Sequence, residues 1–251
     1  CQKLENLTKD TFLKGFKRKS HDSAFQNTGA DIDSSGGTDT GSTKTVTSSI
    51  QVSVDCDVFG TELVKVVDIN RDILVDLKYN SDDNFLDTNL YEDFSDCLLR
   101  KKVACKLARA QDLLSSLKPG YRLICFDCLR PRSVQRRMWD FVKGTPKQSY
   151  VANPDRGSIH NYGAAVDLSI VDETGKLLDM GTDFDDFSEL SHPKMEYVHL
   201  SSGKLTADQV ANRLLLRMVM VKSGFMGIGN EWWHFNGDTR KNIREIYDIV
   251  E

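Results

Sequence analysis

A polar stretch near the beginning of the chain limits where a folded core can form. Residues 20–55 contain 8 Ser, 6 Thr, 4 Gly and 5 Asp, with Phe25 as the only aromatic residue. Such a segment cannot bury enough apolar area to offset the entropy lost when it becomes ordered. The sequence therefore predicts two parts: a flexible tether over residues 1–60 and a single folded domain over residues 61–251.

The first residue is Cys1, and the predicted tether follows it directly. A signal peptidase that cuts before a lipid-modified cysteine leaves this arrangement. We therefore expect a bacterial lipoprotein that contacts a membrane only through a lipid on Cys1. Its expected location is outside the cytoplasm, in the periplasm or cell envelope. If Cys1 only marks where the sequence starts, the expected location is the cytoplasm.

Charge and hydropathy argue against two classes of protein. The 33 Lys and Arg are outnumbered by 37 Asp and Glu, which gives a formal charge of -4 and no general attraction for nucleic-acid phosphates. No apolar run approaches the ~18 residues of a membrane-spanning helix. Nothing in the sequence points to a nucleic-acid or protein partner, so we expect recognition at a defined site.

Downstream of residue 60, strand and helix patterns alternate. Runs rich in Val, Ile and Leu, and one aromatic run, predict strands at residues 63–70, 72–79, 121–126, 165–171 and 231–235. We expect the first two strands to be joined tightly at Asn70 and Arg71. Helices are expected over residues 99–117 and 131–142, between a capping box at Thr206 and a stop at Gly224, and after a cap at Asp238. This mixed order predicts an α+β fold with a mainly antiparallel sheet flanked by helices.

The remaining cysteines allow several interpretations. Cys125 and Cys128 form one CxxC, which fits a redox pair or half of a structural zinc site. Because there is no second CxxC, we expect ordinary buried thiols at the end of a strand. Cys56, Cys97 and Cys105 are odd in number, so the sequence leaves any disulfide pairing undetermined.

A first chemical motif runs from Ser158 to Asp167 and contains His160 and Gly163. The histidine falls in a loop and the aspartate in the strand that follows, so both side chains can face one point. An imidazole and a carboxylate are two of the three protein ligands of a typical catalytic zinc ion. Alone the pair is weak evidence, because a hydrogen-bonded loop histidine gives the same pattern.

A second motif is Glu231-Trp-Trp-His234-Phe. Strict alternation would put Glu231 and His234 on opposite sides of a strand, unless a twist or bulge brings them to one metal. A catalytic zinc needs three ligands, an open position for water and an acid–base carboxylate. His160, Asp167 and His234 fit as ligands and Glu231 as the base. The alternative is an aromatic core strand that ends in a buried histidine.

Together the motifs closely resemble those of VanX-type D-alanyl-D-alanine dipeptidases. The shared segments are Ser-x-His-x-x-Gly-x-Ala-x-Asp and Glu-x-x-His, with Met-Gly-Thr-x-Phe-Asp185 between them and Leu129-Arg130-Pro131 upstream. The resemblance covers about residues 64–251 and not the first 60. It implies a zinc site in the central cleft of a Hedgehog/DD-peptidase-like fold. The family's common Tyr-Arg-Pro is altered at Leu129, which puts in doubt only the contacts of that tyrosine.

The resemblance assigns a role to each matching residue. It implies that His160, Asp167 and His234 bind one zinc ion per chain, that Glu231 is the catalytic acid–base, and that Arg130 stabilises the transition state.

Two further residues are expected to bind substrate by the same resemblance. Asp185 would receive the substrate ammonium group, and Ser158 would lie beside the bound dipeptide, with the substrate carboxylate as its candidate partner. Asp183 and Asp186 lie so close in sequence that a one-residue shift of the loop would change the assignment.

The expected function is zinc-dependent hydrolysis of D-alanyl-D-alanine or a related dipeptide derived from the cell wall. One alternative with the same chemistry is a carboxypeptidase that releases D-alanine from muropeptides. Another is a non-catalytic peptidoglycan-binding module of the same fold. The retained Glu231 argues against that module, because binding alone has no use for a general base.

Overall fold

The computed structural model describes residues 56, 60–92 and 94–251. The expectations for Cys1 and for nearly all of the predicted tether lie outside these residues, so they stay predictions. In the described part, no helix combines the length and the apolar character needed to cross a membrane.

A five-stranded sheet forms the centre of the folded unit, in the order β2-β4-β5-β7-β6. Its strands are β2 (Leu74–Val75), β4 (Arg122–Asp127), β5 (Ala165–Val171), β6 (Met226–Gly227) and β7 (His234–Asn236). Only β2 and β4 pair in parallel, and the other neighbours are antiparallel. A second, two-stranded antiparallel sheet joins β1 (Leu63–Lys65) to β3 (Leu98–Arg100). The mainly antiparallel α+β fold is thereby confirmed.

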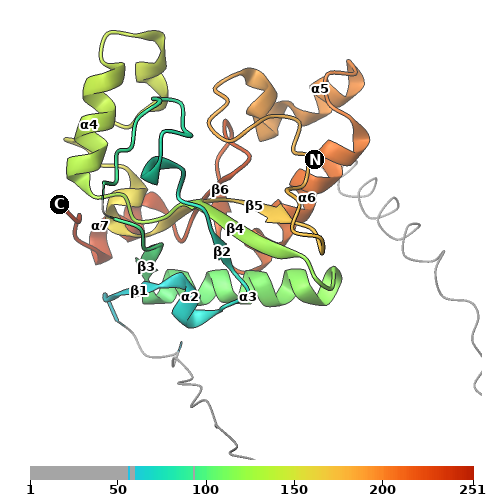
Figure 1. Ribbon diagram of the computed structural model, residues 1–251, viewed down its shortest axis with the longest axis horizontal. Coiled ribbons are helices and arrows are strands. Elements are labelled where there is room, and N and C mark those ends of the chain that lie inside the picture. Colours follow the sequence, from blue (N-terminus) through green and yellow to red (C-terminus); the bar gives the residue numbers. More distant parts are fainter. Residues whose placement is uncertain (1–55, 57–59, 93) are drawn as a thin grey trace, which may run out of the picture. The chain divides into compact units, whose positions relative to one another are not determined.

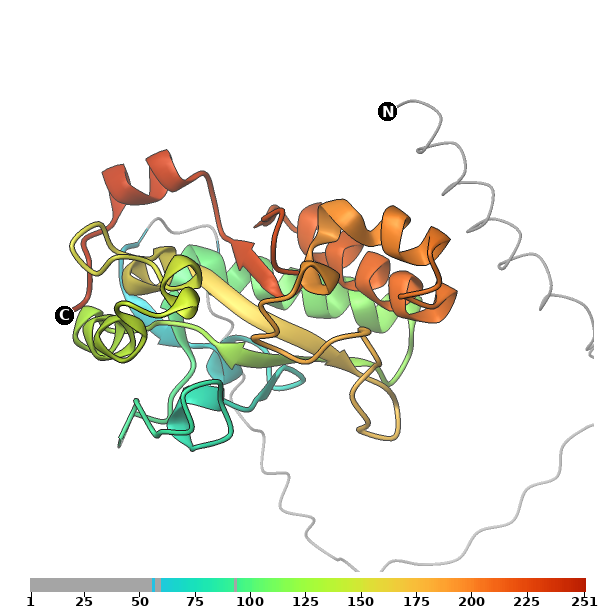
Figure 2. The same ribbon diagram turned by 90° about the horizontal axis from the view of Figure 1, so that it is seen from above.

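Helices surround this sheet. The α-helices of the described part are α2 (Val66–Ile69), α3 (Lys101–Leu117), α4 (Arg132–Val142), α5 (Glu196–Ser201), α6 (Ala207–Lys222) and α7 (Arg240–Ile246). Short 3-10 turns are η1 (Lys78–Asn80), η2 (Pro146–Tyr150), η3 (Ile159–Tyr162), η4 (Glu189–Ser191) and η5 (Pro193–Met195). Helix α3 runs along the sheet, while α4 and α7 lie toward one end and α5 and α6 toward the other (Figures 1 and 2).

The hydrophobic core follows the periodicity of the sequence. Leu107, Ala110 and Leu114 on α3 are fully buried, which is the stripe expected of a helix packed on a sheet. All seven residues of β5 are buried, and strands pair with it on both sides. The first residue of the stripe, Leu99, belongs to β3, so the helix begins two residues later than predicted.

The prediction of two strands joined at Asn70 and Arg71 is wrong. The chain forms β1, then the short helix α2, and reaches β2 only at Leu74. Neither strand pairs with the other: β1 pairs with β3 and β2 with β4. Local alternation identified the extended segments but carried no information about these distant partners.

Two predicted boundaries near the C-terminus also differ. The aromatic strand covers only His234–Asn236, because the chain bends at Trp232 and Trp233. Helix α7 is capped by Thr239, whose hydroxyl accepts a hydrogen bond from the Asn242 amide at 3.1 Å, and not by the preceding aspartate.

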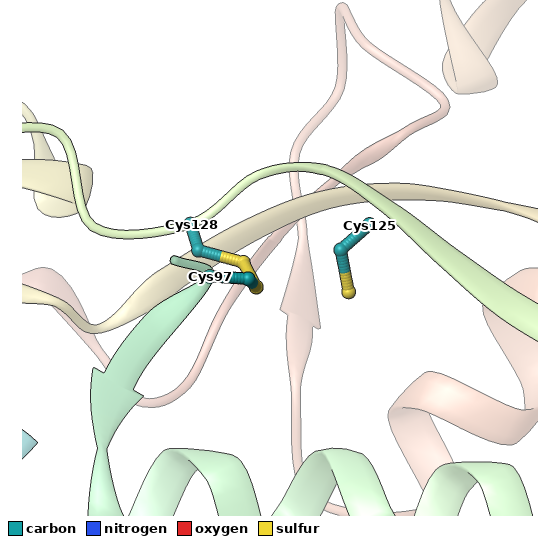
Figure 3. Close-up of side chains that lie close together, drawn as sticks. All are labelled: Cys97, Cys125 and Cys128. Carbon is teal, nitrogen blue, oxygen red and sulfur yellow. A yellow bond between two sulfur atoms is a disulfide. The ribbon is translucent and has the colours of Figure 1, made fainter. Parts of the chain in front are cut away.

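Among the described residues, the cysteines form two disulfides, Cys56–Cys105 and Cys97–Cys128. Cys125 is the free thiol of the described residues, and it is buried. The expectation of buried thiols therefore holds for Cys125 and is wrong for Cys128, whose partner lies 31 residues earlier in the sequence. Figure 3 shows the bonded pair with the third sulfur beside it.

Candidate metal centre and substrate cleft

Three predicted ligands come from separate elements and meet at one point. His160 lies in η3, Asp167 in β5 and His234 at the start of β7. The antiparallel register pairs Asp167 directly with His234, so their side chains are cross-strand neighbours. Asp167 Oδ1 lies 2.9 Å from His234 Nδ1 and 3.3 Å from His160 Nε2. All three residues are buried, and their candidate ligand atoms lie within 4.8 Å of one another.

The loop that presents His160 is fixed locally. The Ser158 hydroxyl and the Asn161 side chain form a capping box around η3. Gly163 ends the turn at a φ of 66°, and a Cβ there would lie 2.7 Å from Leu63 Cδ2. The left-handed backbone angle favours glycine, which explains this position of the motif.

Asp167 and His234 shift each other's pKa values. Burial alone would raise the pKa of Asp167, but the two neighbouring imidazoles hold it below its ordinary value. Burial alone would lower the pKa of His234, yet the hydrogen bond to Asp167 raises it to about 8. Two imidazoles and one carboxylate that converge in a buried site fit the donor set of a divalent metal with an open position.

Glu231 reaches the same point through the bend that precedes β7. Its Oε2 lies 4.0 Å from His234 Nδ1, so the side chains that strict alternation would separate share one side. Burial raises the pKa of Glu231 above the ordinary range of a glutamate. A carboxylate with a raised pKa beside candidate ligands is suited to move a proton.

Arg130 lies in the same cleft and is almost fully buried. Its Nε and Nη2 donate to Asp127, and Nη1 donates to Gln135 Oε1 at 3.0 Å. Burial would lower the pKa of Arg130, but nearby acidic groups, Asp127 first, raise it well above its ordinary value. The guanidinium is thus held in place as a permanent cation at the cleft wall.

Sequence reasoning missed Asp127. This carboxylate is fully buried, accepts from Arg130 and from the Tyr91 hydroxyl, and lies 3.4 Å from His160 Nδ1. The available signal was an acidic residue at the end of the buried strand 121–126, three residues before the arginine. Buried acids of this kind are rarely tolerated unless they are paired.

The candidate ligands, Glu231 and Arg130 line a cleft of about 500 Å³. Asp185 and Ser158 line it too. Asp185 adopts a left-handed φ of 59°, and burial raises the pKa of its carboxyl group well above the ordinary value. Asp186 instead accepts a hydrogen bond from the Ser188 amide within the loop. The structure thus brings all seven predicted site residues to one cleft, while their roles stay predictions.

Comparison with known proteins agrees with the motifs. The family model described as D-ala-D-ala dipeptidase (Peptidase M15) matches residues 60–249. A D-alanyl-D-alanine dipeptidase of Escherichia coli K12 is 36% identical over 175 residues, which are 70% of this chain and 84% of that protein. The dipeptidase of Enterococcus faecium is 31% identical over 150 residues (53% and 70%), and that of Enterococcus faecalis V583 is 31% identical over 178 residues (64% and 83%). The chain therefore belongs to the M15 family of D-alanyl-D-alanine dipeptidases.

Proposed function

We propose that this protein is a zinc dipeptidase that hydrolyses D-alanyl-D-alanine or a closely related dipeptide. The observation that carries the proposal is the meeting of His160, Asp167 and His234 with Glu231 in one cleft. Relatives named as dipeptidases support the substrate class.

The proposed ligands are His160, Asp167 and His234, with one zinc ion per chain. When bound, zinc supplies a Lewis acid that polarises the peptide carbonyl and lowers the pKa of water toward ~7. Glu231 takes a proton from the attacking water and returns it to the nitrogen of the leaving amine. The C–N bond breaks as that proton is delivered, so the products are two free amino acids.

Arg130 faces the charge that develops on the carbonyl oxygen. Three of its N–H groups are committed to Asp127 and Gln135, which fixes the plane of the guanidinium and leaves two N–H groups for an oxyanion. Because these partners are already in place, the donor needs little reorganisation during the reaction.

Asp185 selects a substrate with a free amino group. Asp185 is partly buried in the cleft wall, where losing water makes its ionised form costly unless a cation pairs with it, and the ammonium group of a dipeptide is such a cation. An N-acylated peptide would leave Asp185 without that partner. This preference supports a dipeptidase over a carboxypeptidase that acts on longer muropeptides. Ser158 is the proposed contact of the substrate at the cleft wall.

We also propose that the enzyme works outside the cytoplasm, on dipeptides derived from the cell wall. The two disulfides support this location, because such bonds persist in oxidising compartments and are rare in the cytosol. A lipid on Cys1 would then be the membrane anchor. Mass analysis of that residue in the protein purified from cells tests this part, and an unmodified Cys1 would contradict it.

The decisive experiment is a substrate panel with metal analysis of the same samples. We expect one zinc per chain and cleavage of D-alanyl-D-alanine, with little cleavage of its N-acetylated form or of longer peptides. The reverse preference would favour the carboxypeptidase. Zinc binding without hydrolysis of any D-containing peptide would favour a binding module.

A further inference from the structure

The Cys97–Cys128 disulfide lies at the edge of the metal centre. Cys97 immediately precedes β3, and Cys128 immediately follows the end of β4. The pairing of β4 with β5 is irregular between Cys125 and Asp127 and ends there. The chain therefore leaves the sheet just before it supplies Arg130, and the disulfide holds it at that point.

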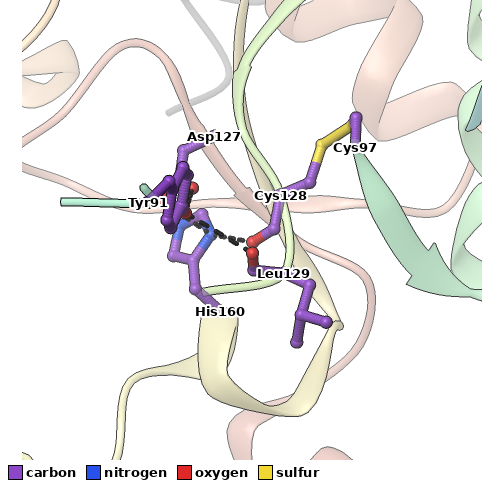
Figure 4. Close-up of a disulfide and its surroundings, with 6 residues drawn as sticks. All are labelled: Tyr91, Cys97, Asp127, Cys128, Leu129 and His160. Atoms are coloured by element: carbon purple, nitrogen blue, oxygen red, sulfur yellow. Dashed lines mark hydrogen bonds and ion pairs between the residues drawn. A yellow bond between two sulfur atoms is a disulfide. The ribbon is translucent and has the colours of Figure 1, made fainter. Parts of the chain in front are cut away.

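The backbone carbonyl of Cys128 contacts a candidate ligand directly. It lies 2.7 Å from His160 Nδ1. Figure 4 draws this contact as a dashed line. A carbonyl oxygen only accepts hydrogen bonds, so this contact places the proton of the neutral imidazole on Nδ1. The other ring nitrogen, Nε2, then points its lone pair toward Asp167 and His234. Such outer contacts commonly set the orientation of a metal-binding histidine.

The residues after Cys128 are held between the same two segments. The Leu129 amide donates to the Leu98 carbonyl at 2.9 Å, on the side of the disulfide. The Arg130 amide donates to the His160 carbonyl at 3.1 Å, on the side of the metal loop. The segment 128–130 is thus linked to β3 by the Cys97–Cys128 bond and one hydrogen bond, and to His160 by two further contacts.

We propose that the Cys97–Cys128 disulfide is a positioning element of the metal centre, which fixes the Cys128 carbonyl that orients His160. This inference rests on the proposed function, because it concerns the affinity of the same site for zinc. Without the disulfide, the Leu129–Leu98 hydrogen bond is the nearest remaining link to β3. The carbonyl can then move and His160 can rotate. The expected cost is 10- to 100-fold in zinc affinity, as for other outer contacts of metal-bound histidines.

The neighbouring thiol does not replace this bond. The Sγ of Cys125 lies within 4.8 Å of both bonded sulfurs. It is fully buried, and burial raises the pKa of Cys125, so it stays protonated and is a poor nucleophile toward the disulfide. The bond is therefore expected to persist until an external reductant acts on it.

The first test uses the full chain with Cys56→Ala and Cys105→Ala, which leaves Cys97–Cys128 as the disulfide of the described residues. A phosphine reduces it to two thiols while the phosphine gains oxygen from water, and reoxidation restores it. We expect the zinc Kd, measured by competition with a chelator, to rise 10- to 100-fold on reduction and to recover afterwards. The visible spectrum of the cobalt-substituted protein should change in parallel. An unchanged Kd and spectrum, with both thiols titrated, would overturn the proposal.

The second test removes the sulfurs, so that freed thiols cannot bind metal themselves. Cys97→Ala with Cys128→Ala is compared with Cys56→Ala with Cys105→Ala, because each pair deletes one disulfide. The sequence separations of 31 and 49 residues give similar expected losses of stability. Only the first pair should lose zinc affinity. Equal losses in both would reduce the effect to general destabilisation and overturn the proposal. If the first pair fails to fold, the cobalt spectrum of the reduced protein decides, because metal held by freed thiols would give a sulfur-ligated spectrum and metal at the His160 site would not.

These outcomes are separable from the proposed function. The oxidised native chain tests that function by itself, through its zinc content and its hydrolysis of D-alanyl-D-alanine. A native chain that binds zinc and shows no hydrolysis refutes the dipeptidase while the affinity comparison still stands. A native chain that hydrolyses the dipeptide, with no effect of reduction on zinc affinity, refutes only the positioning role.

Discussion

The hydroxyl of Tyr79 donates a hydrogen bond to Asp185 Oδ2 at 2.7 Å, across 106 residues of sequence. It holds in place a carboxylate whose backbone has a left-handed φ of 59°. Conformations of this kind cost energy in residues other than glycine and persist where the surroundings impose them, often at functional sites. The Tyr79–Asp185 pair thus joins the turn η1 to the loop before η4 at the wall of the cleft.

Replacing Asp185 with Asn should lower the activity of the enzyme toward substrates with a free amino group. A charge-assisted hydrogen bond to an ammonium is worth about 1.5–3 kcal/mol, so kcat/KM for D-alanyl-D-alanine should fall roughly 10- to 150-fold. Asp186→Asn is the matched control, because Asn can keep the hydrogen bond from the Ser188 amide. A large loss in the control with none in Asp185→Asn would show that Asp186, and not Asp185, binds the ammonium group.

The same substitution should stabilise the metal-free protein at neutral pH. Because burial raises the pKa of Asp185 above its unfolded value of about 3.9, ionising it in the folded state costs free energy. That cost is absent below about pH 4, grows between the unfolded and the folded pKa, and stays constant above the folded pKa. The unfolding free energy of Asp185→Asn should therefore exceed that of the native chain increasingly above pH 4 in urea denaturation. A constant difference across pH would contradict this linkage.

Glu231→Gln should separate metal binding from turnover. The amide keeps the size of the side chain but cannot take a proton from water, so kcat should fall by about 10²- to 10⁴-fold. Zinc content should stay at one per chain, because Glu231 is not among the proposed ligands. Metal analysis beside steady-state kinetics checks both. Undiminished hydrolysis would remove Glu231 from the mechanism.

Substitution of any proposed ligand should release the metal. His160→Ala, Asp167→Ala and His234→Ala are each expected to lose most of the bound zinc, and chelation of the native enzyme should abolish an activity that added zinc restores. His192→Ala serves as the control, since this histidine is partly exposed and lies outside the cluster. Full metallation of His234→Ala would show that another residue is the third ligand.

Asp127→Ala should lower the free energy of unfolding and should also slow the reaction. Removing one partner of the buried Asp127–Arg130 ion pair leaves a buried charge unpaired, at a typical cost of about 3–5 kcal/mol. Tyr91→Phe deletes a single hydroxyl bonded to the same carboxylate and should cost only about 1–3 kcal/mol. Denaturant unfolding of both variants measures the two costs. Similar losses of unfolding free energy would show that the ion pair contributes no more to stability than the single hydrogen bond.

Local signals in the sequence predicted much of this structure. The seven buried residues of β5, the stripe of α3 and the capping box at Thr206 are each encoded within a few neighbouring residues, and each is found. The pairing of β1 with β3 and the partner of Cys128 depend on contacts between distant segments, so spacing alone could not supply them.

The candidate site divides in the same way. The ligand motifs were recognisable because residue types and spacing carry the chemistry of a metal site. The bend at Trp232 and Trp233, which turns Glu231 toward His234, has no local signature, and strict alternation predicted the opposite. The role of Asp127 was hidden because its partners, Tyr91 and His160, come from distant segments.

The register that pairs Asp167 with His234 has a mechanical consequence. Strand β7 is only three residues long, and its outer neighbour β6 has two. A metal bound by both residues would link this short edge of the sheet to the long strand β5. Slow hydrogen exchange of the β7 amides would then depend on the ion, and its loss would let the edge fray and carry Glu231 away from the cleft. The same ion would then act as a catalytic cofactor and also stabilise the edge of the sheet.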